Sequence, residues 1–150
     1  MRYFLDTEFN GFGGELMSVG LACEDGDQDY YVAIPIEGAY EPWVEQHVVP
    51  YLESVPRMLY NRLDRIAAAH DIAAYLGNDG DVVIIADWPE DIALFCRLLL
   101  VGETEIVDIQ RLRFEFRRTP GFSTARNSAV PHNALHDARA LRDHILSLDG

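Results

Sequence analysis

The run Asp81-Val82-Val83-Ile84-Ile85-Ala86 decides the fold class, because a short continuous apolar run between turn signals is typical of a central strand buried on both faces. Pro89 follows the run and is well placed to open a helix. Before the run, residues 63–76 carry apolar side chains at helical spacing, and Gly77 ends that predicted helix. A buried strand between two helices indicates an α/β domain.

The first third of the chain predicts three strands in an antiparallel meander. Residues 3–8, 15–22 and 30–34 have strand-like patterns, and segments rich in glycine, asparagine or aspartate separate them. Together with the buried run and a short strand at 105–109, they predict an α/β fold with a mixed five-stranded sheet. The sequence places the flanking helices at 42–52, 63–76, 89–101 and from residue 132 or 133 to 148.

Composition bounds the class of protein. The chain has 150 residues, a formal net charge of −13 and 49% hydrophobic residues. These values exclude the collagen-like, coiled-coil and disordered classes. The length suits one domain, and the sequence contains no internal repeat, low-complexity tract or linker, so we expect a single domain over residues 1–150.

The sequence also bears on location. The N-terminal apolar stretch is interrupted by Asp6 and Glu8, which argues against an export signal. The longest mainly apolar segment, residues 92–101, is charged and far shorter than the roughly 20 residues that cross a bilayer. Cys23 and Cys96 lie far apart in apolar contexts, as expected for buried thiols in a reducing compartment. We therefore expect a cytoplasmic protein with no membrane partner.

Two carboxylates in the first strand share a face. Strand alternation places Asp6 and Glu8 on the same side as Phe4, with Cα atoms about 6 to 7 Å apart, close enough to hold one cation or two adjacent ones. The alternative is an edge strand with a solvated acidic face. The pair alone does not decide between these interpretations.

A third carboxylate lies on the apolar side of the last helix. Asp137 is one turn before Leu141 in the stripe that faces the core. Because an unpaired buried carboxylate costs several kcal/mol, we expect it to have a cation, a donor or a shifted pKa, unless the position reaches water. His132 stands five residues earlier, where an imidazole can lie over the site or serve only as a cap or surface group.

A fourth candidate follows the buried strand. Asp87, Glu90 and Asp91 fall where that strand ends and a helix begins, and binding sites in open α/β sheets collect at this edge. Acidic residues in a first helical turn are also favoured by the helix dipole, so simple capping is the competing explanation.

Taken together, residues 4–9, Asp91 and residues 132–138 resemble the three motifs of the DEDDh 3′–5′ exonucleases in order, spacing and type. The chain looks most like the small bacterial branch called polyadenylate-specific 3′-ribonuclease AS. It departs from the pattern in the second motif, where many members carry asparagine and an aromatic residue and this chain has Asp87 and Glu90. His136 replaces an acid that commonly precedes the last aspartate, which leaves His132 with the H-x(4)-D spacing.

The resemblance implies a ribonuclease H-like fold and metal-dependent removal of nucleotides from RNA with a free 3′ end. It implies that His132 is the catalytic base and that two Mg²⁺ or Mn²⁺ ions are held by Asp6, Glu8, Asp91 and Asp137. Four hard oxygen donors suit these ions better than zinc. If the register of the second motif were shifted, Asp87 would take the role of Asp91. The resemblance also implies a homodimer, for which the sequence shows no interface.

The charge distribution moderates the objection that an acidic protein should avoid nucleic acid. Residues 1–56 contain 11 acidic residues and one arginine, whereas residues 111–126 contain five arginines and one glutamate. We expect Arg117 and Arg118 in this segment to guide the RNA backbone; a solvated loop or a subunit contact is the alternative.

Two aromatic residues flank the candidate ligands. Phe9 and Trp88 are candidates for stacking on terminal bases, and core packing is the competing role. The alternative functions are a DNA 3′–5′ exonuclease, an enzyme for short oligonucleotides, and a catalytically inactive nucleic-acid-binding module.

Overall fold

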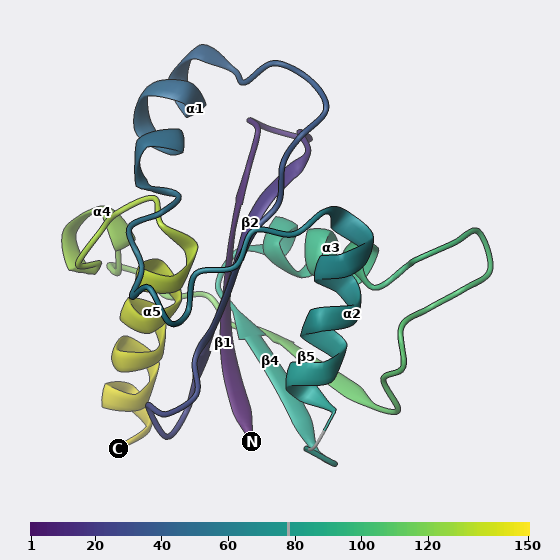
Figure 1. Ribbon diagram of the computed structural model, residues 1–150. Coiled ribbons are helices and arrows are strands. Elements are labelled where there is room, and N and C mark those ends of the chain that lie inside the picture. Colours follow the sequence, from purple (N-terminus) through teal and green to yellow (C-terminus); the bar gives the residue numbers. More distant parts are fainter. Residues whose placement is uncertain (78) are drawn as a thin grey trace.

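Five strands form one mixed sheet in the order β3-β2-β1-β4-β5 (Figure 1). The structure is a computed structural model that describes residues 1–77 and 79–150. The sheet confirms the predicted α/β class and is consistent with a ribonuclease H-like fold. The strands are β1 (Arg2–Phe9), β2 (Leu16–Cys23), β3 (Tyr30–Ala33), β4 (Val82–Ala86) and β5 (Leu112–Phe116).

The strand β1 lies at the centre of the sheet and joins its two halves. It pairs antiparallel with β2 on one side and parallel with β4 on the other. The antiparallel register places Asp6 opposite Gly20 and Glu8 opposite Ser18. Because cross-strand partners point to the same face of a sheet, these four residues share one face.

The helices predicted over residues 63–76, 89–101 and from residue 132 or 133 to 148 are present, although the second ends at Leu98. The short helix Thr124–Asn127 was not predicted, and the helix predicted over residues 42–52 is broken near residue 48. The predicted helix over residues 42–52 divides into α1 (Pro42–His47) and a 3₁₀ turn, η1 (Val49–Tyr51). Pro50 explains the break, since proline has no N–H to continue the helical ladder. None of the helices in residues 1–77 and 79–150 is long and apolar enough to cross a membrane. The others are α2 (Arg65–Leu76), α3 (Pro89–Leu98), α4 (Thr124–Asn127) and α5 (Ala134–Asp149).

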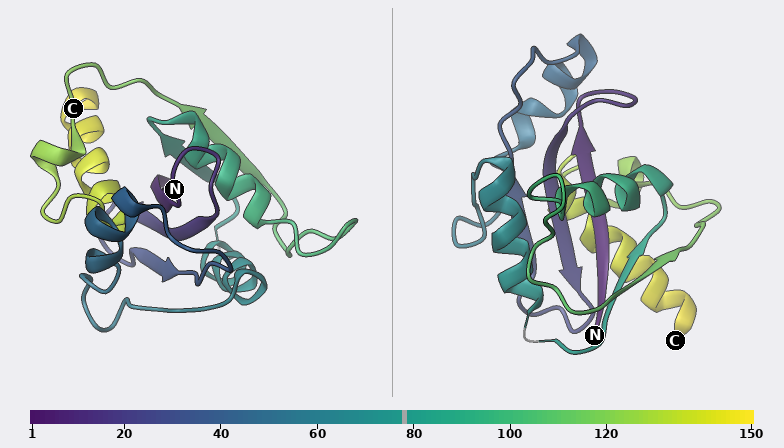
Figure 2. Two further views of the ribbon diagram at one scale, coloured as in Figure 1. Left: turned by 90° about the horizontal axis from the view of Figure 1, so that it is seen from above. Right: turned by 90° about the vertical axis from the view of Figure 1, so that its right-hand side faces the viewer.

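Helices cover both faces of the sheet, as the two views in Figure 2 show. On one face, α5 packs on β1 and β2 around Phe4, Ile85 and Leu141. On the other, α2 and α3 cover a larger core that includes Leu5 and Phe95. The alternation predicted for β1 is therefore confirmed: its even-numbered residues face α5 and its odd-numbered residues face α2 and α3.

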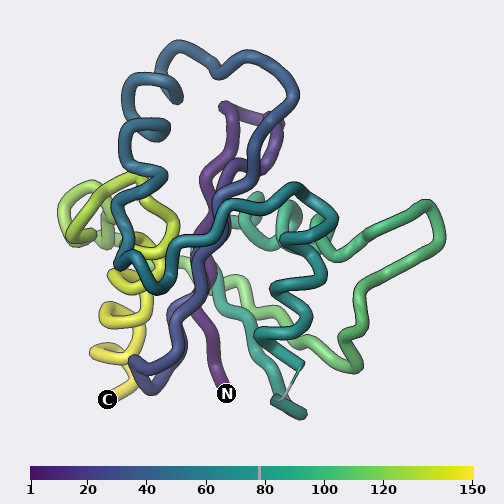
Figure 3. The backbone as a smooth tube through the Cα atoms, in the orientation of Figure 1, coloured from purple at the N-terminus to yellow at the C-terminus, as the bar shows by residue number. Residues whose placement is uncertain are grey.

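The fifth strand is not where the sequence places it. Residues 105–109 form no strand; they fold back on the end of α3, where Val107 donates to the Leu99 carbonyl and an isolated bridge joins Leu100 to Ile106. Figure 3 shows this connection extending away from the sheet. The strand that pairs with β4 is β5, whose side chains are largely exposed. The apolar character of residues 105–109 serves a local loop and not the sheet.

The prediction of two buried thiols is half right. Cys23 is buried at the end of β2, whereas Cys96 is exposed on α3. An amphipathic helix buries only one side, and the Phe95 side chain takes the buried position beside Cys96.

Candidate cation site

The carboxylates of Asp6, Glu8 and Asp137 meet in one cluster, with one oxygen from each lying within 4.8 Å of the others. Two come from β1 and the third from the first turns of α5, which lies beside β1 in Figure 1. The site occupies the end of the sheet away from both chain termini. These three residues are among the four that the family resemblance implies as metal ligands.

Gly20 allows α5 to approach β2 closely enough for this meeting. A Cβ atom built on Gly20 would lie under 3.0 Å from backbone atoms of Ala134 and Leu135, where real Cβ contacts essentially never occur. Only glycine leaves room for the helix backbone at this point. Since Gly20 stands directly opposite Asp6, the close approach fixes the distance between the two halves of the cluster.

The start of α5 is held by two devices. The N-cap residue Asn133 accepts from the backbone N–H groups of Leu135 and His136, and its amide donates to the Tyr51 carbonyl at 2.9 Å. His132 adopts a left-handed conformation with φ +67°, which costs a non-glycine residue about 1 to 2 kcal/mol. This conformation directs the His132 N–H to Asp137 Oδ2 at 3.2 Å.

Asp91 enters from the opposite face of the sheet. It is buried in the first turn of α3 and accepts a hydrogen bond of 2.6 Å from the hydroxyl of Thr7. Its charge raises the pKa of both Asp6 and Glu8, so Asp91 lies near the cluster. It is not one of the three residues whose oxygens lie within 4.8 Å of one another. The Thr7 bond orients Asp91 beside the other carboxylates.

The four carboxylates resist ionising together. Burial is the largest cause in each case; charges of other members of the four add to it for Asp6 and Glu8, and the charge of Asp87 adds to it for Asp91 and Asp137. The pKa of Glu8 rises to about 8, that of Asp91 to about 7 and that of Asp137 to about 6. The pKa of Asp6 is also raised well above its ordinary value. Nearby positive charge would relieve this repulsion.

The cluster fits a hard divalent cation. Asp6 Oδ2 and Asp137 Oδ1 are buried and have no hydrogen-bond partner among the described residues. Buried carboxylate oxygens normally have a partner, and the donors here are all oxygen atoms. We conclude that Asp6, Glu8 and Asp137 suit Mg²⁺ or Mn²⁺, with Asp91 at the margin of the same site.

The two candidate histidines differ in their surroundings. The ring of His136 bonds the Ser54 carbonyl at 2.7 Å, which ties α5 to the preceding segment. The ring of His132 meets the edge of Trp43, with centroids 5.2 Å apart, and Trp43 stacks on His47. Burial and the nearby charge of His47 lower the pKa of His132, which favours a neutral imidazole. His132 is thus the better candidate base.

Asp87 has a partner outside the cluster. Its Oδ2 accepts from the Thr119 hydroxyl at 2.8 Å, which ties the segment after β5 to the end of β4. Its charge still raises the pKa of Asp6, Asp91 and Asp137. Asp91 is the more buried of the two and is the better match to the ligand role.

The proposed RNA-contacting residues are only partly gathered at the site. The guanidinium of Arg117 binds both carboxylate oxygens of Asp149, at 2.8 and 3.2 Å, at the far end of α5. Arg118 is exposed and pairs with no acid among the described residues. Trp88 is 58% exposed at the start of α3, and Phe9 is half-buried at the end of β1. Of the two arginines, Arg118 is the one available to a ligand.

Sequence reasoning missed two exposed aromatic residues, of which Trp43 contacts the candidate base His132. Phe12, at the tip of the β1–β2 turn, is 99% exposed, and Trp43 on α1 is 55% exposed. Phe12 carries a local signal, because a large apolar side chain between Gly11 and Gly13 has no strand or helix face to enter. Trp43 carries none, since its contact with His132 joins residues 89 positions apart.

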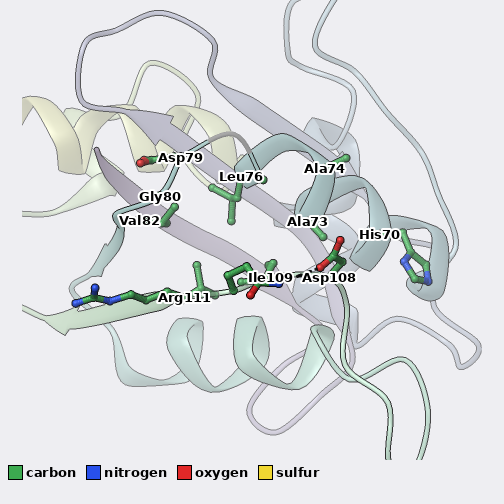
Figure 4. Close-up of a pocket in the computed structure, with 13 residues that line it drawn as sticks. His70, Ala73, Ala74, Leu76, Asp79, Gly80, Val82, Asp108, Ile109 and Arg111 are labelled. Atoms are coloured by element: carbon green, nitrogen blue, oxygen red, sulfur yellow. Dashed lines mark hydrogen bonds between the residues drawn. The ribbon is translucent and has the colours of Figure 1, made fainter.

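A separate pocket contains none of these carboxylates. It has a volume of about 480 Å³ and lies between the end of α2 and residues 108–112, with His70 and Asp108 at one end and Arg111 at the other (Figure 4). The candidate site is therefore defined by its cluster of charged groups and not by this cavity.

The raised pKa values predict how stability depends on pH. Glu8, Asp91 and Asp137 hold protons in the folded protein that they release at lower pH when unfolded. The free energy of unfolding of the metal-free protein should therefore fall, on the order of a few kcal/mol, as the pH rises from about 4 to 8. Added Mg²⁺ should flatten this decline. Urea denaturation across this pH range, with EDTA or Mg²⁺, measures it, and a flat metal-free profile would contradict the clustered carboxylates.

The fold and the site define a class: an α/β domain with a cluster of acidic side chains at one end of its sheet. Two proteins named 3′-5′ exoribonuclease, from Mycobacterium tuberculosis strains CDC 1551 and H37Rv, are each 36% identical to this chain over 83 residues. Each alignment covers 53% of this chain and 48% of the relative, so the chain spans about half the length of the curated relatives it matches. No protein-family model matches the chain.

Proposed function

We propose that this protein is a metal-dependent 3′–5′ exoribonuclease of the DEDDh type, with His132 as general base. The observation that carries the proposal is the cluster of Asp6, Glu8 and Asp137 with its buried, unpartnered oxygens. The partial similarity to proteins named 3′-5′ exoribonuclease supports the same activity. Asp91 fits as the fourth carboxylate, since it is buried and hydrogen-bonded beside them.

The carboxylates would hold two Mg²⁺ or Mn²⁺ ions. When bound, a pair of such ions stabilises the attacking and leaving oxygens of an in-line phosphodiester displacement. Asp6 and Glu8 would supply their carboxylates from β1, Asp137 from α5 and Asp91 from α3. Because the ligands come from three elements fixed by core packing, the chain presents them without reordering.

His132 would move the proton in the hydrolysis. Its neutral ring takes the proton of a water molecule while the water oxygen forms a bond to the last phosphorus. The bond from phosphorus to the 3′ oxygen breaks, and that oxygen takes a proton from solvent, to which His132 returns the proton that it accepted. The products are a nucleoside 5′-monophosphate and an RNA shorter by one residue. The hydrogen bond from the His132 backbone to Asp137 keeps this base beside the ligands.

A time course on a 5′-labelled single-stranded RNA and its DNA counterpart tests the proposal. With Mg²⁺ or Mn²⁺, wild type should shorten the RNA in single-nucleotide steps from its 3′ end, and EDTA should stop the reaction. His132→Ala should slow it about 100- to 10,000-fold, whereas His70→Ala, which changes an exposed histidine on α2, should not. Intact RNA with both metals would refute the activity, and preferential shortening of DNA would refute the substrate.

Arg118 and Arg117 should affect RNA binding unequally. Because Arg118 is exposed and unpaired with the described acids, Arg118→Ala should weaken RNA binding and reduce the slope of log K against log salt by about one. Arg117→Ala should change binding less, because its guanidinium is held by Asp149. Fluorescence anisotropy with catalytically inactive protein at several salt concentrations measures both, and equal slopes for wild type and Arg118→Ala would reject the role.

The homodimer that the family resemblance implies stays a prediction.

A further inference from the structure

Four buried side-chain oxygens have no hydrogen-bond partner in residues 1–77 and 79–150, and they gather around the candidate site. Two belong to the proposed ligands Asp6 and Asp137, and two are the hydroxyls of Ser18 and Ser128. Ser18 stands opposite Glu8 in the β1–β2 pair. Buried hydroxyls without partners are rare, so a concentration of them at one site points to a missing interaction there.

The hydroxyl of Ser128 lies against Asp137. Ser128 directly follows α4, which packs on α5, and its backbone N–H donates to the Thr124 carbonyl at 2.9 Å. The nearby hydroxyl opposes the effect of burial on the pKa of Asp137, as expected for a donor that favours the charged carboxylate. The hydroxyl is thus close to the carboxylate but does not meet hydrogen-bond geometry.

The two oxygens of Asp137 are differently placed. Oδ2 accepts from the backbone of His132, whereas Oδ1 is buried without a partner, as is the hydroxyl of Ser128. A hydroxyl can rotate to suit its neighbours, so one small adjustment joins the pair. Carboxylates that bind metals are themselves commonly hydrogen-bonded, and these outer partners fix the orientation of the ligand.

We propose that Ser128 is a positioning residue for the cation site, whose hydroxyl donates to Asp137 when a divalent ion is bound. The inference rests on the proposed function, because it assumes that Asp137 is a metal ligand. The bond restricts Asp137 to the rotamer that faces Asp6 and Glu8. Ser128 itself touches neither the substrate nor the reacting atoms.

Calorimetric titration of the metal-free protein with Mn²⁺ tests the role of Ser128. Ser128→Ala should weaken Mn²⁺ binding about tenfold or more, the effect typical of losing an outer hydrogen bond to a metal ligand. Ser128→Thr keeps the hydroxyl and should restore affinity to within about threefold of wild type. Ser147→Ala is the control, because it removes a hydroxyl at the far end of α5, the helix that carries Asp137.

Two further readouts separate positioning from a general loss of structure. The melting temperature of metal-free Ser128→Ala should lie close to that of wild type, since the hydroxyl makes no hydrogen bond of good geometry in that state. Raising Mn²⁺ should restore most of its RNA hydrolysis, as expected for a defect in affinity. Wild-type Mn²⁺ affinity in Ser128→Ala, or an equal loss in Ser128→Thr, would overturn the role while leaving the proposed function intact. Absence of Mn²⁺ binding by wild type would overturn both.

Discussion

Replacement of Asp6 by asparagine should lower RNA hydrolysis at least about a thousandfold and at the same time make the metal-free protein more stable. The loss follows because a metal site supplies several kcal/mol of transition-state stabilisation, and Asp6 is central to the cluster. The gain follows because Asp6 must either hold a proton or repel Glu8 and Asp91 in the folded protein, and asparagine does neither. The new amide also offers these carboxylates a donor.

The two effects of Asp6→Asn are measured separately. Initial rates on labelled RNA give the loss, and chemical denaturation in EDTA at pH 7.5 gives the gain, which we expect to be about 1 kcal/mol or more. Asp27→Asn is the control, because Asp27 is exposed in the β2–β3 turn and the charge change is the same. A variant that is less stable than wild type in EDTA would show that the carboxylates are not crowded.

Substitution of Gly20 by alanine should damage both folding and activity. The new methyl group would overlap the backbone at the start of α5, and neither partner is a flexible side-chain end that can turn aside. Overpacking of this kind costs about 1 to 3 kcal/mol. The first turn of α5 must shift, and a displacement of about 1 Å in the proposed ligand Asp137 should cost about a hundredfold in rate.

Gly80→Ala is the matched control for Gly20→Ala. Gly80 is exposed and a Cβ atom there meets nothing within 4 Å, so the substitution should change stability by less than about 0.5 kcal/mol. Thermal melts and RNA hydrolysis rates compare the two variants. Wild-type activity in Gly20→Ala would mean that the contact between α5 and β2 does not set the site.

The parts of the site that follow a simple period could be predicted from the sequence. Asp6 and Glu8 share a face because side chains alternate along a strand, and the structure confirms this. Asp137 is buried, as its place in the apolar stripe of α5 predicted. The strand Val82–Ala86 was recognisable from its continuous apolar run, because side chains on both faces of this strand are buried.

Contacts between distant segments could not be predicted in this way. The bond from Thr7 to Asp91 joins residues 84 positions apart, and the tight approach of α5 to Gly20 depends on the packing of two elements. A glycine within a strand indicates a close approach without naming the partner. The pairing of Arg117 with Asp149 likewise removed one proposed RNA contact from the open surface.

The error in the fifth strand has a physical cause. Residues 105–109 and β5 (Leu112–Phe116) each contain three apolar and two charged residues, so apolar content does not distinguish the loop from the strand. An edge strand buries little of its surface, so charged residues are acceptable there and the apolar pattern loses its value as a guide. The segment that becomes the fifth strand is the one that pairs with β4, and this pairing cannot be read from the local sequence pattern.

The central claim is that these carboxylates form a divalent cation site, and calorimetric titration of the metal-free protein with Mn²⁺ at pH 7.5 tests it most directly. We expect saturable binding of two ions per chain for wild type. Asp6→Asn should lose at least one of them, and Asp27→Asn should keep both. Absence of saturable binding by wild type, or identical binding by Asp6→Asn, would contradict the account.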